Sequence, residues 1–162
     1  MTYKLNLLTL VFFVFSVTLV TPAIYGTASA EEKFSFGRSI EGTYILDQHS
    51  ETDRSSYTFT EFGSVIWSAA DQKKYSYFPG AGVWKQTGDH QISVRIISFD
   101  YDNKGIGIVD MKFNFDDKFQ TVTGKFKGGI YPLDVDVNVI DKKPMQEFES
   151  DFTGVRLSNA GG

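Results

Sequence analysis

The sequence predicts an all-β protein that forms a single antiparallel up-and-down β-barrel of about eight strands. The main observation is three consecutive stretches, 90–101, 106–115 and 119–126, in which apolar and polar residues alternate. Short turn-rich segments of Asp, Asn, Lys and Gly join them, so we expect an antiparallel meander. These strands exceed the usual length of about five or six residues, as the strands of closed barrels do. No segment after residue 30 shows convincing helical periodicity.

The first thirty residues are predicted to be a signal peptide rather than part of the fold. Lys4 supplies a positive start, residues 5–20 are almost wholly apolar, and residues 28–30 form a small-residue cleavage pattern. Cleavage after Ala30 would leave residues 31–162 as one barrel domain, secreted or periplasmic, with no stable insertion in a membrane. The alternative is an uncleaved membrane anchor, but the apolar run is shorter than the ~20 residues that a spanning helix needs.

Charge and cysteine content exclude several classes of function. Without Lys4 the chain carries fifteen Lys and Arg against twenty Asp and Glu, a formal charge of −5. This balance argues against nucleic acid or an anionic membrane as the main partner, because both are bound by clustered cations. The chain has no cysteine, which excludes thiol catalysis, thiolate metal sites and a lipid-modified N-terminus. Stability must therefore come from packing, to which the many aromatic residues contribute large buried areas.

Four strands are expected before the meander. After a loose lead-in over 31–39, the first strand alternates around Tyr44 and Leu46. The second, dense in Thr, Tyr and Phe, forms a hairpin with the third through a turn at Gly63. Pro79 and the glycines beside it are expected to prevent a regular strand, so the fourth starts after them. These strands are expected over 40–47, 55–62, 65–70 and 83–87.

The meander and the strands after it differ in regularity. In the first meander strand the apolar residues change parity after Ile96, which predicts a β-bulge or sharp bend. In the second, the alternation around Phe113 is regular. Phe148 and Phe152 share one face of the closing strand. The last strands are expected at 119–126, briefly within 130–140, and at 145–157.

Signals for catalysis and metal binding are weak. His49 and His90 are the only two histidines, and neither stands in a metal-ligand or triad pattern. Asp134 and Asp136 are interpreted as the solvated face of a strand rather than as an acid–base pair. We therefore predict no metal and no cofactor, and the catalytic residues, if the protein is an enzyme, are unassigned.

A turn rich in Asp and Asn resembles a calcium-binding loop. It begins at Asp100 and carries a glycine at its sixth position. However, Lys104 and Met111 occupy positions where such a loop has ligands. A plain hairpin turn is therefore predicted.

The strongest candidate for a functional site is an aromatic interior, because small barrels either fill their inside or hold one small ligand. Arg95 is the one charged candidate. If it faces inward, its guanidinium needs a ligand or an anionic partner such as Glu61 or Glu147. If it faces outward, it is a solvated surface residue. The predicted lining residues are Tyr57, Phe59, Trp67, Trp84, Arg95, Met111, Phe113, Phe126, Phe148 and Phe152.

Two features resemble the calycin-type barrels, the group that contains lipocalins, fatty-acid-binding proteins and the allene oxide cyclase type. Gly42, Thr43 and Tyr44 resemble the Gly-x-Trp of lipocalins, with Tyr in place of Trp, and Arg156 stands near the end of the last strand. In lipocalins a late arginine packs across that aromatic ring. The stretches 82–88 and 119–124 are also similar to exported bacterial proteins of the allene-oxide-cyclase type. The resemblance implies a cup-shaped barrel that holds a small apolar molecule.

The sequence predicts an exported barrel that binds a small hydrophobic ligand in its aromatic interior. One alternative is a cyclase or isomerase of the allene-oxide-cyclase type, whose cavity and polar groups such as Arg95, Glu61 or Tyr57 hold a reactive conformer. The other is a structural or interaction module with a filled core, in which exposed aromatics at 75, 77 and 78 contact a protein. The small apolar molecule is the expected partner, and the oligomeric state is open.

Overall fold

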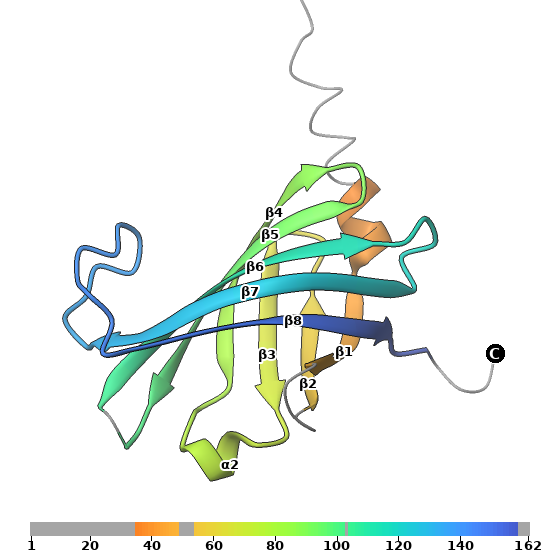
Figure 1. Cartoon of the computed structure of the whole chain (residues 1–162). Coiled ribbons are helices and arrows are strands. Elements are labelled where there is room, and N and C mark those ends of the chain that lie inside the picture. Colours follow the sequence, from red (N-terminus) through yellow and green to blue (C-terminus); the bar gives the residue numbers. More distant parts are fainter. Residues whose placement is uncertain (1–34, 49–53, 103, 159–162) are drawn as a thin grey trace, which may run out of the picture.

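Eight antiparallel strands close into one barrel, as the sequence predicts (Figure 1). The structure, a computed structural model, describes residues 35–48, 54–102 and 104–158. The predicted signal peptide and His49 lie outside these residues. None of the described helices is long and apolar enough to cross a membrane. The strands are β1 (Gly42–Gln48), β2 (Arg54–Phe59), β3 (Ser64–Ala69), β4 (Gly80–Gly88), β5 (Gln91–Asp100), β6 (Gly105–Phe115), β7 (Thr121–Pro132) and β8 (Gln146–Arg156).

Each strand pairs with the next one along the chain, and β8 pairs with β1 to complete the ring. The closing ladder sets Tyr44 opposite Arg156 and Leu46 opposite Gly154. The ladders between β5, β6, β7 and β8 contain ten or eleven residue pairs each, so the predicted meander and the closing strand form the longest wall. Because the ring is closed, no long strand edge remains unpaired.

A short helix over residues 35–40 covers one end of the barrel, where a loose lead-in was expected (Figure 1). Phe36 and Ile40 are buried in the barrel core. The helix lies so close to the β2–β3 turn that a Cβ on Gly37 would stand 2.3 Å from the Glu61 carbonyl oxygen, so only glycine fits there. We call this end the Arg156 end, because β8 finishes there. The opposite end, where β5 finishes, is the Asp100 end; the second short helix, α2 (Gln72–Tyr75), lies on that side.

Strand β4 begins at Gly80, three residues earlier than predicted. The glycines, which were expected to interrupt the strand, instead allow it to approach β5. A Cβ on Gly82 would lie 1.9 Å from the Arg95 carbonyl oxygen, so no larger residue fits without moving the backbone.

The alternation of β5 does not change parity. Ile96, Ser98 and Asp100 all face inward and are buried, and the register with β6 is unbroken. The predicted bulge in this strand is therefore wrong. The register shifts instead in the β4–β5 ladder, between Gln86 and Gly88.

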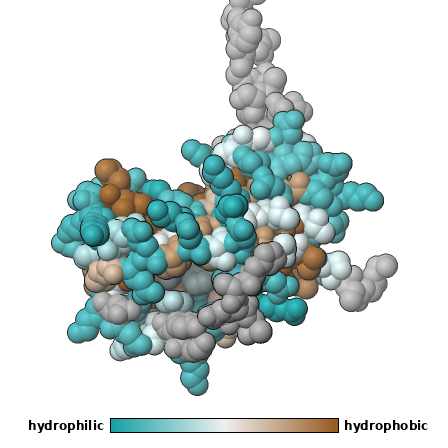
Figure 2. Space-filling model, viewed as in Figure 1, coloured by the Kyte–Doolittle hydropathy of each residue, from teal (hydrophilic) through white to brown (hydrophobic). Residues whose placement is uncertain are grey.

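The connection between β7 and β8 covers Ile97, Ile106 and Ile108 on the outer face of β5 and β6. It consists of turns rather than the short strand expected within 130–140. Ile106 and Ile108 are only 6% and 2% exposed because Val135 and its apolar neighbours in this connection pack over them. This connection lies at the left of Figure 2, where an apolar patch stands out from a mostly hydrophilic surface.

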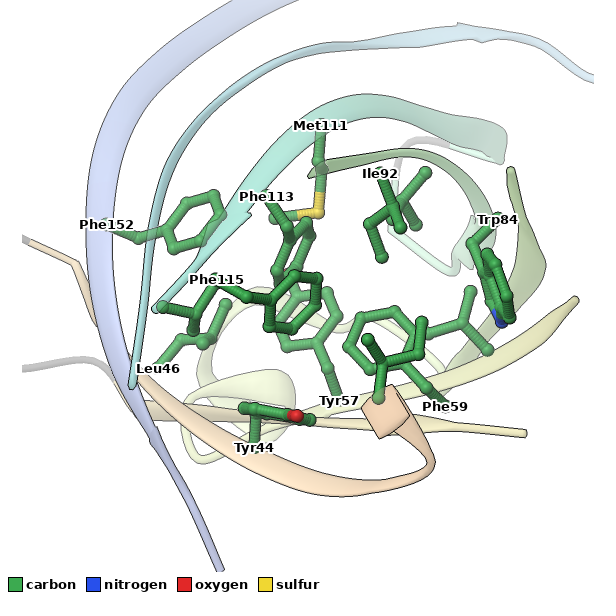
Figure 3. Close-up of a cluster of buried hydrophobic side chains, with 14 of the residues drawn as sticks. Tyr44, Leu46, Tyr57, Phe59, Trp84, Ile92, Met111, Phe113, Phe115 and Phe152 are labelled. Carbon is green, nitrogen blue, oxygen red and sulfur yellow. The ribbon is translucent and has the colours of Figure 1, made fainter. Parts of the chain in front are cut away.

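The main core fills the Arg156 end of the barrel. Its aromatic side chains meet at the centre, where Phe113 is fully buried and lies 5.3 Å from Phe59 and 4.7 Å from Phe152 between ring centroids (Figure 3). Edge-to-face contacts such as that between Phe59 and Phe113 stabilise the core in addition to the burial of apolar ring surface. The sixteen buried members are Phe36, Ile40, Tyr44, Leu46, Tyr57, Phe59, Val65, Trp84, Ile92, Val94, Ile96, Met111, Phe113, Phe115, Val122 and Phe152.

Candidate functional site

Inward side chains become smaller and more polar from the Arg156 end toward the Asp100 end. Along β6 the inward side chains become smaller, from Phe to Met, Val and Gly. Along β5 the inward residues change from Ile92 and Val94 to Ser98 and Asp100. A barrel wall keeps its diameter along its length, so smaller side chains leave space. The β6 series is Phe115, Phe113, Met111, Val109 and Gly107.

A cavity of about 250 Å³ occupies this space at the Asp100 end. Aromatic side chains line this cavity from two opposite sides of the barrel. Trp67 of β3 lies 6.4 Å from Tyr77, and Phe126 of β7 lies 6.3 Å from Phe148 of β8, between ring centroids. Strands β3 and β7 stand four positions apart in the closed order of eight, so the two pairs face each other across the barrel. The aromatic lining residues are Tyr57, Trp67, Tyr77, Phe126 and Phe148.

The cavity also has polar groups. Asp100 is 4% exposed and Ser55 is 3% exposed, and both lie on the inward faces of their strands. The Ser55 Oγ and the Trp67 Nε1 are buried and find no hydrogen-bond partner in the described part of the chain. Burial raises the pKa of the Tyr57 phenol. The Ser55 hydroxyl lies near enough to oppose this rise, although not in hydrogen-bonding geometry. The cavity is therefore an aromatic space with buried polar groups.

The structure divides the ten predicted lining residues among three places. Tyr57, Trp67, Phe126 and Phe148 line the cavity. The remaining aromatic and aliphatic residues of the set belong to the filled half of the barrel and do not touch the cavity: Phe59, Trp84, Met111, Phe113 and Phe152.

Arg95, the tenth, lies on the outer face. Its guanidinium makes two hydrogen bonds to Asp110, both 2.7 Å long, and Asp110 thereby raises the pKa of Arg95. Its Nη1 also donates to the carbonyl oxygens of Val137 and Asn138 at 3.3 and 3.5 Å. Arg95 therefore holds the β7–β8 connection against the barrel, and the partners suggested for it, Glu61 and Glu147, are not the ones it meets.

Sequence reasoning missed the polar lining residues. The predicted change of parity after Ile96 would turn Ser98 and Asp100 outward. Had the alternation of Ile92, Val94 and Ile96 been continued to the end of the strand, both would have been placed inside. The misleading signal came from the outward residues Ile97, Phe99 and Tyr101. Ile97 packs under the β7–β8 connection, whereas Phe99 and Tyr101 are exposed.

At the Arg156 end, Tyr44 and Arg156 make the contact that the resemblance implies. The Arg156 guanidinium carbon lies 5.8 Å from the centre of the Tyr44 ring. The guanidinium donates to the carbonyl oxygens of Ser39, at 3.0 Å, and Glu41, so it ties the end of helix 35–40 to β8. Gly42 has a φ of 132°, which permits the sharp change from this helix into β1. An eight-stranded closed barrel with this contact is compatible with a calycin-like fold.

Tyr44 itself is buried, and its hydroxyl donates to the Phe119 carbonyl oxygen at 3.0 Å. Burial raises the pKa of Tyr44 to about 12, while the nearby charge of Arg156 opposes the rise. This phenol is structural and lies outside the cavity.

The other candidate chemical groups have structural partners. His90 stacks on Phe119, with 5.1 Å between ring centroids, and its Nδ1 lies 3.2 Å from the Asp116 carbonyl oxygen. Asp134 pairs with Lys142, whose hydrogen bond lowers the pKa of that carboxyl. Asp136 accepts a hydrogen bond from the backbone of Asn138 at 2.9 Å. Within the described residues, no group of three or more His, Asp or Glu side chains is arranged to hold a metal ion.

Comparison with known proteins finds no match for this chain among protein-family models, curated proteins or solved structures. The family that the resemblance suggests therefore remains a prediction. We conclude that the chain is an eight-stranded antiparallel β-barrel with a calycin-compatible fold.

Proposed function

We propose that this protein is an exported binding protein that holds one small hydrophobic molecule in the cavity at the Asp100 end. The observation that carries the proposal is the division of the barrel interior. One half is packed with aromatic side chains, and the other half encloses about 250 Å³ between aromatic walls. A cavity of ~150 Å³ lined by apolar side chains is enough to bind benzene, so this one suits a ligand of one ring with a short substituent, or a compact two-ring ligand.

The packed half supports this function by fixing the walls. Tyr57 belongs to both halves: it lines the cavity, and its ring lies 5.6 Å from that of Phe113 in the core. Walls held by a packed core need little rearrangement to accept a ligand, which favours binding. The signal-peptide pattern of residues 1–30 supports export.

The two tryptophans allow a direct test. Trp67 lines the cavity, whereas Trp84 is buried in the packed half with its Nε1 donating to the Thr60 carbonyl oxygen at 3.0 Å. In a Trp84→Phe variant, Trp67 is the sole tryptophan of the chain and reports on the cavity. We expect its fluorescence to change in a saturable way when 2-phenylethanol, a neutral one-ring ligand, is titrated in. In Trp67→Phe, the remaining Trp84 should not respond.

A pair of glycine variants supplies the control. A Cβ on Gly107 would meet the Ser98 Oγ at 3.4 Å and the Ser98 carbonyl oxygen at 3.6 Å, both ordinary contact distances, so Gly107→Phe places a ring in the cavity without a backbone clash. A Cβ on Gly88 would meet only Gln91, at 3.5 Å, and Gly88 lies away from the cavity. On the Trp84→Phe background, Gly107→Phe should abolish the response and Gly88→Phe should retain it. Equal binding by both variants would show that the ligand does not occupy this cavity.

A cyclase or isomerase is the second candidate, because polar groups do converge on the cavity. Of the residues suggested for it, only Tyr57 lines the cavity, since Arg95 pairs with Asp110 and Glu61 pairs with Arg38. Ser55 and Asp100 would then be the groups that hold a reactive conformer. Conversion of a bound polyunsaturated epoxide, followed by chromatography, would distinguish this candidate from a binding protein, which returns its ligand unchanged.

A further inference from the structure

The buried carboxylate of Asp100 distinguishes this cavity from a purely apolar one. Asp100 ends β5 on its inward face and is 4% exposed. A buried carboxylate is stabilised by cations and hydrogen-bond donors, and its two oxygens can accept about four hydrogen bonds in all.

The described lining of the cavity has an acidic balance. Asp71, Asp100 and Glu149 contribute carboxyl groups, and Arg54 is the only basic residue among the described lining residues. The Arg54 side chain is 71% exposed, and its Nε donates to Asp47 at 2.8 Å on the outer face. The Arg54 charge is thus directed to Asp47, and the excess of acidic over basic lining residues favours a positively charged ligand group.

The aromatic walls favour the same charge. The faces of Trp and Tyr rings carry negative electrostatic potential and attract organic cations within about 6 Å. Trp67 and Tyr77 stand on one side of the cavity, and Phe126 and Phe148 stand on the other. A flat ring fits between such walls, and a cationic group on a short chain can reach the polar side.

Two buried polar atoms add an independent indication that a polar ligand group belongs here. The Ser55 side chain is 3% exposed and its Oγ has no hydrogen-bond partner in the described residues. The Trp67 Nε1 is likewise buried without a partner there. Unsatisfied buried polar atoms are rare in folded proteins, and a bound ligand or water can satisfy them. A hydroxyl such as that of Ser55 can accept a hydrogen bond from an ammonium group.

We propose that the cavity binds a small arylalkyl amine in its protonated form, with the ammonium group at Asp100 and Ser55 and the aromatic ring between the two aromatic walls. This inference rests on the proposed binding function and specifies its ligand class. Asp100 at the end of β5 and Ser55 at the start of β2 would select the ammonium group. The aromatic lining residues would bind the ring of the ligand.

Three ligands of matched size test the proposal in the full chain carrying Trp84→Phe. They are 2-phenylethylamine, which is cationic, 2-phenylethanol, which is neutral, and phenylacetate, which is anionic. We expect the amine to bind about tenfold more tightly than the alcohol, because a hydrogen bond to a charged group contributes more than a neutral one. Phenylacetate should bind more weakly than the alcohol. In Asp100→Asn, the affinity for the amine should fall more than the affinity for the alcohol, so that the tenfold difference between the two ligands is lost.

The outcomes separate this inference from the function on which it rests. If the alcohol binds as tightly as the amine, and Gly107→Phe abolishes both, the binding function stands and the amine class is wrong. Tighter binding of phenylacetate would also overturn the amine class. If none of the three binds at millimolar concentration, both proposals fail. The comparison of the three ligands does not depend on Asp100→Asn, so it decides the matter even if that variant does not fold.

Discussion

Tyr44 and Arg156 show how single residues close one end of the barrel. The Tyr44 ring supports the guanidinium, and the guanidinium holds the helix carbonyls. A lysine at 156 would not reproduce this arrangement, because a planar guanidinium can stack on the ring and donate to two carbonyls at once. Side-chain contacts, rather than the backbone hydrogen bonds of a strand ladder, therefore join the helix over residues 35–40 to β1 and β8.

Tyr44→Phe tests the role of the phenol through pH. Below pH 10 the variant should be less stable by about 1 kcal/mol, because it lacks the hydrogen bond to the Phe119 carbonyl. The folded-state pKa of Tyr44 is raised from 10.0 to about 12, so the unfolded chain releases this proton first. The stabilisation is therefore complete below pH 10 and is lost as the pH rises toward 12.

The measurement is the urea midpoint of both proteins as a function of pH. The difference between them should shrink above pH 10 and change sign before pH 12, because only the wild type has a phenol that is deprotonated in the unfolded chain and still protonated in the folded one. A difference that stays constant across this range would contradict the assignment of the raised pKa to Tyr44.

At the scale of elements, the β7–β8 connection acts as an external cover. It supplies apolar side chains over Ile106 and Ile108 and receives hydrogen bonds from Arg95. The same contacts give β5 and β6 a second buried face over part of their length. This explains why their apolar residues do not follow the simple rule of one buried and one solvated face.

Arg95→Ala should release this cover while leaving the barrel closed. We expect a loss of about 1 kcal/mol in unfolding free energy, since a partly exposed ion pair and its hydrogen bonds to the connection disappear. Trypsin should then cut faster after Lys142. Lys125→Ala is the matched control, because it removes a surface ion pair with Asp151 away from the connection. Equal rates of trypsin cleavage in Arg95→Ala and Lys125→Ala would mean that Arg95 does not hold the β7–β8 connection against the barrel.

On the scale of the whole molecule, the barrel has two halves with different tasks. The half at the Arg156 end is sealed by a helix and filled with aromatic rings, which supplies stability without disulfides. The half at the Asp100 end is less densely packed and contains a cavity. Phe113 lies where the two halves meet, in contact with the ring of Tyr57.

Phe113→Ala should affect both halves. Loss of a fully buried ring should cost about 3–5 kcal/mol in unfolding free energy, because the surrounding rings cannot close the space. The new space adjoins Tyr57, so the cavity should also accept a larger ligand such as 2-(1-naphthyl)ethylamine. Urea unfolding gives the first quantity and Trp67 fluorescence on the Trp84→Phe background gives the second. An unchanged preference for one-ring ligands would show that the two spaces stay separate.

Local sequence patterns were enough to predict the barrel, an aromatic inward face and the bounds of seven strands to within three residues, whereas β7 runs six residues past its predicted end at 126. These depend on local patterns: a strand alternates with period two, and turn residues mark its ends. The tertiary structure alone decided that Arg95 lies outside and Asp100 inside, and that Phe126 and Phe148 line a cavity whereas Phe113 and Phe152 fill the core. Each of these outcomes depends on contacts between distant segments, since closure of the ring and the cover from the β7–β8 connection decide which apolar residues are buried and where space remains.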